Sequence, residues 1–228
     1  MGDRLQGKRV LCTHADSFMG PAIVELFRAE GADVVADTSD LTPPDACDDI
    51  VEAAGDLDAL VVNLSHPPRA SAVTEIADAD LASLHDTLVV SLMRLTRAAT
   101  PGMVARGRGK IVVMSSAAPL RGIPKNAAYC AARGAQNAFV RAAGLELAPH
   151  NVQMNAIAQN YVDNPTYFPR ELLASERFHR HLERNVPARR TAHGWESAEL
   201  ALFLASDKSD FLVGQVIPFA GGWVTTTG

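Results

Sequence analysis

The sequence predicts a single α/β domain, built on a doubly wound parallel sheet between two layers of helices. Short apolar runs of strand length alternate with longer helical patterns along the chain. This alternation is typical of a parallel sheet that helices cover on both faces. No repeat, linker or break in composition divides the 228 residues, so we expect one domain over residues 1–228.

The expected elements follow one another in regular order. Strands are predicted at residues 9–13, 33–36, 59–63, 110–114, 153–157 and 216–219. Helical segments are predicted at residues 21–29, 46–54, 80–105, 127–148, 172–183 and 197–206. Ligands of such sheets bind beyond the carboxyl ends of the strands. In this chain those ends carry the polar residues Thr13, Asn63, Ser115, Ser116, Gln159 and Asn160.

Composition and charge exclude several classes of protein. Hydrophobic residues make up 47% of the chain and charged residues 21%, as in an ordinary soluble globular protein. The net charge of -5 is not the excess of basic residues that is typical of nucleic-acid-binding proteins, which argues against a nucleic-acid partner. No apolar run reaches the length of a membrane span, and the first residues do not resemble a signal peptide. We therefore expect a cytoplasmic protein without nucleic-acid or membrane partners.

Metal binding is not expected either. The three cysteines, Cys12, Cys47 and Cys130, are far apart, odd in number and form no CxxC motif, which indicates reduced thiols. The histidines do not stand at metal-ligand spacing with carboxylates in a convincing set.

Three residues in the middle of the chain carry the strongest functional signal. Ser116, Tyr129 and Arg133 stand in the spacing Ser-x12-Tyr-x3-Arg. Tyr129 and Arg133 are four residues apart on a predicted helix and therefore project from one face. A permanent cation beside a phenol favours the phenolate, so Tyr129 is the expected base. Ser116 is expected to position a substrate oxygen, because no His–Asp pair supports a serine nucleophile.

Over nearly its whole length the chain resembles the short-chain dehydrogenases/reductases, and more specifically the related halohydrin dehalogenases. The reductase pattern after the first strand is Thr-Gly-x3-Gly-x-Gly, of which residues 13–20 keep only Gly20 as a glycine. The dehalogenase pattern Thr-x4-aromatic-x-Gly is matched by Thr13, Phe18 and Gly20. The reductase motif Tyr-x3-Lys ends here in Arg133.

Two further departures concern the places where a reductase contacts its dinucleotide. Gln159 and Asn160 replace the usual Pro-Gly after the fifth strand. In the first turn, glycines let the backbone approach a pyrophosphate at a helix N-terminus, whereas His14 and Phe18 add side chains there. The sequence therefore predicts a Rossmann-like three-layer domain without a functional dinucleotide site, and no cofactor.

The resemblance implies a carbon–halide lyase. Its reaction is the displacement of halide from a vicinal haloalcohol by the neighbouring alkoxide, which closes an epoxide; the reverse reaction opens epoxides with small anions. The resemblance further implies a halide and substrate pocket in the space that a nicotinamide would take. Its expected lining is Phe18, Gln159, Asn160, Tyr161, Val162 and Phe168.

The resemblance also implies a bacterial enzyme that assembles as a homotetramer through its long helices. Some dehalogenases place an acid beside the residue equivalent to Asn63, where it couples to the arginine of the triad. This chain has Leu64 there, so the sequence does not identify the partner of Arg133. Tyr167, in the aromatic segment after the fifth strand, could equally face a neighbouring subunit.

Two alternatives stay open at this point. One is an NAD(P)-dependent short-chain oxidoreductase with a divergent cofactor loop. The other is a non-catalytic binding protein on the same fold, because fold does not fix function. The retained triad counts against the second alternative.

Overall fold

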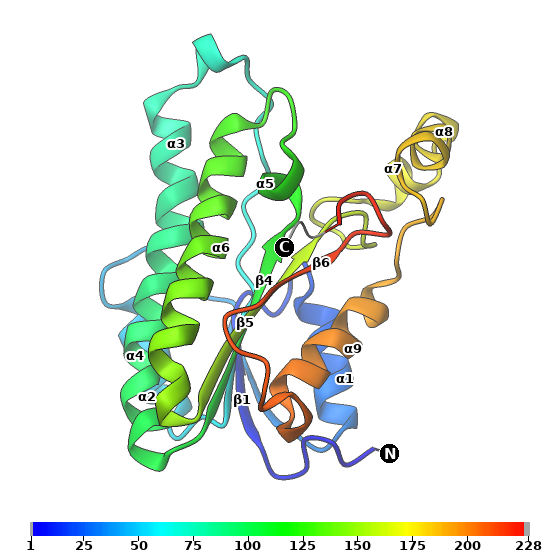
Figure 1. Ribbon diagram of the computed structural model, residues 1–228. Coiled ribbons are helices and arrows are strands. Elements are labelled where there is room, and N and C mark those ends of the chain that lie inside the picture. The colour runs from blue at the N-terminus through cyan, green and yellow to red at the C-terminus, as the bar shows by residue number, and fades with distance from the viewer. Residues whose placement is uncertain (1, 226–228) are drawn as a thin grey trace.

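The computed structural model describes residues 2–225, whose six strands form one parallel sheet (Figure 1). The strands are β1 (Arg9–Cys12), β2 (Asp33–Ala36), β3 (Ala59–Val62), β4 (Gly109–Ser116), β5 (Val152–Gln159) and β6 (Val216–Phe219). Their order across the sheet is β2-β1-β3-β4-β5-β6. The chain winds first to one side of β1 and then to the other, so the predicted doubly wound sheet is confirmed.

Helices cover both faces of this sheet. On one face α1 (Gly20–Ala29) packs against α9 (Gly194–Ala205); α2 (Ala46–Ala54), α4 (Ser91–Arg106) and α6 (Ala127–Leu147) lie on the other (Figure 1). The remaining α-helices are α3 (Asp78–His85), α5 (Ala118–Arg121), α7 (Arg170–Leu173) and α8 (Glu176–Asn185). Short helical turns are η1 (Val73–Glu75), η2 (Asp86–Val90), η3 (Ala148–His150) and η4 (Asp207–Ser209). None of the described helices is long and apolar enough to cross a membrane.

The central strands divide their side chains between two apolar cores. Every residue of β3, β4 and β5 is buried. Successive residues of a strand point to opposite faces. On β4, Ile111 and Val113 accordingly belong to the core beneath α4 and α6, and Val112 and Met114 to the core beneath α1 and α9.

Two predicted helices differ in the structure. The segment expected at 80–105 is α3 and α4 joined by the π-helical turn η2, where the Ser91 hydroxyl donates to the Asp86 carbonyl at 3.0 Å. The segment expected at 172–183 is α7 and α8. They are separate because the Ser175 hydroxyl caps α8 by accepting from the Phe178 N–H at 3.3 Å.

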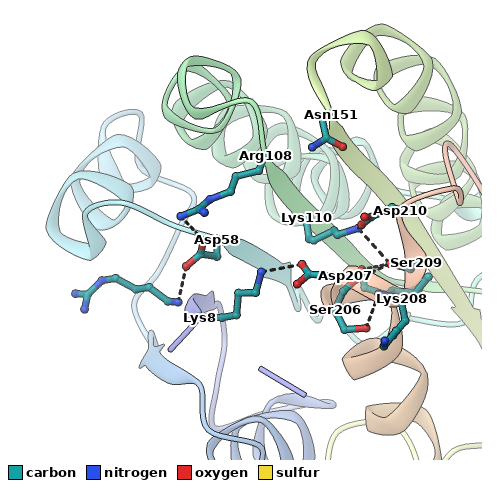
Figure 2. Close-up of polar contacts among 12 residues, drawn as sticks. Lys8, Asp58, Arg108, Lys110, Asn151, Ser206, Asp207, Lys208, Ser209 and Asp210 are labelled. Atoms are coloured by element: carbon teal, nitrogen blue, oxygen red, sulfur yellow. Dashed lines mark hydrogen bonds and ion pairs between the residues drawn. The ribbon is translucent and has the colours of Figure 1, made fainter. Parts of the chain in front are cut away.

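Ion pairs hold the segment after α9 to the amino-terminal ends of the strands (Figure 2). Lys8 contacts Asp207 at 2.7 Å, and Lys110, only 6% exposed at the start of β4, contacts Asp210 at 2.5 Å. These pairs therefore lie at the end of the sheet opposite the carboxyl ends of the strands.

Asp207→Asn is expected to lower the melting temperature at pH 7 by about one or two degrees, because the paired carboxylate is largely exposed. The Lys8 hydrogen bond holds the pKa of Asp207 below its ordinary value. A lowered pKa stabilises the fold above the unfolded-state pKa of about 3.9, and this stability is lost as the pH falls through the folded-state value. The difference in melting temperature between the two proteins should therefore shrink as the pH is lowered from 7 to below the unfolded-state pKa. A difference that stays the same over this range would contradict the pairing.

Candidate active site

A cavity of about 360 Å³ lies at the carboxyl ends of β4 and β5. It is lined by seven of the residues predicted from the sequence, namely Phe18, Ser116, Tyr129, Gln159, Asn160, Val162 and Phe168. Arg133 and Tyr161, which were predicted with them, do not line it. The cavity wall also includes Tyr167, Asn164 and Thr166 from the segment after β5.

Ser116 ends β4 with its hydroxyl fixed in place. Its Oγ accepts a hydrogen bond from the Ala118 N–H at 3.1 Å, which leaves the hydroxyl proton free to be donated into the cavity. The preceding Ser115 instead donates to Asn137 Oδ1 at 2.7 Å within the core. The β4–α5 connection thus presents one serine hydroxyl to a bound molecule.

Tyr129 and Arg133 lie on successive turns of α6 and touch each other. Arg133 Nε donates to the Tyr129 hydroxyl oxygen at 3.2 Å. Tyr129 reaches the cavity, whereas Arg133 is completely buried behind it. The guanidinium therefore contacts the candidate base and not a bound molecule.

The guanidinium of Arg133 has an oxygen acceptor for each of its five N–H groups. Besides Tyr129, these are the carbonyls of Met114 and Leu64 at 3.1 Å, Gln136 Oε1 at 2.9 Å and the Tyr167 hydroxyl at 3.0 Å. Burial disfavours the charged guanidinium, but the two phenol oxygens outweigh it and raise the pKa of Arg133 above its ordinary value.

Tyr167 is the residue that sequence reasoning did not place in the site. Its hydroxyl accepts from Arg133 and from the His66 N–H, both at 3.0 Å, and its ring packs edge-on against Phe18 at 5.1 Å between centroids. Burial raises the pKa of Tyr167 far above its ordinary value. The neighbouring Asn164 holds this segment, because its Oδ1 accepts from the Tyr167 N–H at 2.8 Å.

The β1–α1 turn is closed by the chain's own groups. The Phe18 N–H donates to Thr166 Oγ1 at 2.8 Å, and the Asn63 amide donates to the carbonyls of His14 and Ser17 at 2.9 and 3.0 Å. A pyrophosphate needs free N–H groups and open backbone at this turn. At this turn the Phe18 N–H is already taken by Thr166, and the Phe18 side chain stands where the reductase pattern has a glycine.

Gly20 is required by the same turn. A Cβ at this position would lie 2.5 Å from the Ala15 carbonyl oxygen. We expect Gly20→Ala to lower the free energy of unfolding by about 2 kcal/mol or more, measured by urea denaturation. The matched control is Gly134→Ala within α6, where a Cβ meets only Pro119 at 3.5 Å and alanine should stabilise the helix. Equal stability of the two variants would contradict this packing.

Tyr161 lies in a different cluster, contrary to the prediction. Its backbone has a positive φ of 54°, and its ring packs near Phe178 and Trp223 at 6.4 and 5.9 Å between centroids. Its hydroxyl contacts His181 Nε2 at 2.9 Å. The left-handed backbone directs this side chain away from the cavity, while Asn160 and Val162 on either side of it remain in the wall.

The chain matches the family described as enoyl-(acyl carrier protein) reductase over residues 6–224 and belongs to that family. It is 31% identical to an uncharacterized oxidoreductase of Bacillus subtilis, over 81% of this chain and 75% of that protein. It is 29% identical to the 3-oxoacyl-(acyl-carrier-protein) reductase of Thermotoga maritima, over 97% and 99% of the two chains.

Among solved structures, one described as a dehalogenation enzyme is 33% identical and superposes with a TM-score of 0.91, covering 97% of this chain and all of that one. The chain is thus similar both to relatives named as oxidoreductases and to a solved structure named as a dehalogenation enzyme.

Proposed function

We propose that this protein is a halohydrin dehalogenase that works without a nicotinamide. The observation that carries the proposal is that Phe18 and Thr166 close the turn a dinucleotide would need, while Tyr129 still faces a cavity. When the base removes a hydroxyl proton and no hydride acceptor is present, the alkoxide can react only if another group accepts an electron pair. A leaving group on the adjacent carbon does so when it departs with the electrons of its bond. The structural neighbour named as a dehalogenation enzyme supports the same assignment.

The residues act in one displacement step. Ser116 donates a hydrogen bond to the substrate hydroxyl oxygen, and the Tyr129 phenolate takes its proton. The alkoxide oxygen attacks the adjacent carbon from behind, a C–O bond forms and the C–halide bond breaks. The products are an epoxide, a halide ion and a proton held on Tyr129. The reverse step opens an epoxide with a small anion.

The departing halide needs a pocket on the far side of the reacting carbon from Tyr129. Asn160, Val162 and Phe168 line the cavity along the segment after β5, and Phe18 lines it from the β1–α1 turn. Polar amide groups among apolar walls are suited to a weakly hydrated anion. We assign these four residues, with Gln159 beside them, to the halide and substrate pocket.

The experiment is a bromide-release assay. Purified protein is mixed with a vicinal bromoalcohol and no nicotinamide, and bromide and acid are followed against the uncatalysed background. We expect both to appear together. No bromide above background, under conditions where the protein is folded, would remove the dehalogenase assignment.

One observation favours the oxidoreductase alternative. Asp37 directly follows β2, is 6% exposed, and its Oδ2 has no hydrogen-bond partner among the described residues. In dinucleotide-binding sheets an acidic residue near this place bonds the ribose hydroxyls. The oxidoreductase alternative is tested by measuring the binding of NADH and NADPH through their fluorescence. Tight binding of either would favour the reductase.

We propose a cytoplasmic bacterial enzyme that acts on small haloalcohols and epoxides and forms a homotetramer through α4 and α6. Light scattering of the purified protein measures the mass of the assembly, and a monomer would contradict this part.

A further inference from the structure

Arg133 is a buried cation held by neutral groups. Its side chain has no exposed surface, and it donates to two backbone carbonyls, one amide oxygen and two phenol oxygens. Burying a charge costs free energy unless hydrogen bonds and an opposite charge compensate. Here the hydrogen bonds are complete but every acceptor is neutral, so the positive charge would stabilise any contacting group that becomes an anion.

The two phenols bind adjacent nitrogens of the guanidinium. Nε donates to Tyr129 at 3.2 Å, and Nη2 donates to Tyr167 at 3.0 Å. A carboxylate commonly binds a guanidinium bidentately, with one oxygen accepting from each of two such donors. Tyr129 and Tyr167 together therefore take the role that one bidentate carboxylate would otherwise fill.

The surroundings of Tyr167 keep its hydroxyl neutral. The groups that face it are Arg133 and Tyr129 from α6, the His66 N–H, and the Phe18 ring. The His66 imidazole is turned to the Ser83 hydroxyl at 2.9 Å. Burial raises the pKa of Tyr167 although the Arg133 charge opposes this effect. Tyr167 therefore accepts from Arg133 without adding a negative charge.

We propose that Tyr167 is a positioning residue that holds the Arg133 guanidinium against Tyr129. Because Tyr167 is neutral, it does not compensate the positive charge of the guanidinium, which then stabilises the Tyr129 phenolate. A carboxylate in the same place would hold the guanidinium equally well but would neutralise it. The inference rests on the proposed role of Tyr129 as the base. It accounts for a triad arginine that lacks an acidic partner beside Asn63, where the chain has Leu64.

The test is a tyrosinate titration of the ligand-free protein by ultraviolet absorbance. The chain has only three tyrosines, and the titration that is lost in Tyr129→Phe is the one that reports on Tyr129, hereafter the first titration. Tyr167→Phe should move it to higher pH by about one pH unit, a tenfold smaller phenolate fraction.

Tyr161→Phe is the matched control, because its hydroxyl contacts His181 and not Arg133. It should leave the first titration where it lies in the unaltered protein. Thermal unfolding checks each variant. Should Tyr167→Phe not fold, Tyr167→Glu replaces it and should move the first titration upward further, since a carboxylate neutralises Arg133.

An unmoved first titration in a folded Tyr167 variant would overturn the inference. The titration needs no substrate, so its outcome is separable from that of the proposed reaction. Absence of bromide release with the expected titration shifts would overturn the dehalogenase assignment alone.

Discussion

Tyr129→Phe is expected to lower bromide release from a vicinal bromoalcohol by about a thousandfold, because the reaction then lacks its base. The substitution removes one oxygen atom, which accepts a hydrogen bond from Arg133 Nε. The ring remains in the core beneath α6, so the melting temperature should change by only a few degrees. Initial rates of bromide release and thermal unfolding measure the two effects.

The matched control for this variant is Tyr161→Phe, which removes a phenol oxygen outside the cavity and should keep near-normal turnover. Residual activity of more than a few per cent in Tyr129→Phe would remove Tyr129 as the base.

Arg133→Lys is the second substitution with a large expected effect. An ammonium group has three N–H donors, whereas the guanidinium uses five, so acceptors in the core lose their partners. We expect the free energy of unfolding to fall by about 3 kcal/mol, measured by urea denaturation. The cation also loses its fixed contact with Tyr129, so turnover should fall by about a hundredfold and the acid limb of the pH–rate profile should move to higher pH.

Arg121→Lys serves as its control. Arg121 is exposed, stacks over the Trp223 ring at 4.9 Å and donates to the Trp223 carbonyl at 2.9 Å, so its replacement should leave the profile in place. An unchanged acid limb in a folded Arg133→Lys protein would contradict the role of Arg133 as the cation that favours the phenolate.

The fold was predictable because its signals are local. The apolar strands and the helices at 21–29, 46–54 and 127–148 follow from short-range patterns, and the structure places them within one or two residues. The turn η2 was missed because a π-helical insertion keeps the helical pattern on both sides. The division between α7 and α8 depends on one capping serine, Ser175, inside a polar segment.

The candidate site was predictable where a motif fixes the spacing, as for Ser116, Tyr129 and Arg133. Tyr161 was misplaced because its positive φ is a property of the folded loop, which the residue type does not reveal. Tyr167 was not assigned because its partners, Arg133 and His66, are distant in sequence. The Asn164-Pro165 pair was the available signal, since such pairs favour a turn.

The most direct test of the central claim is the stoichiometry of turnover without nicotinamide. A vicinal bromoalcohol is incubated with the purified protein, and epoxide, bromide and protons are measured in the same samples, with and without added NADH or NADPH. Equal amounts of the three products, formed at a rate that neither nicotinamide changes, are the predicted result. Consumption of NADH or NADPH with a carbonyl substrate, together with no epoxide and no bromide, would contradict the account.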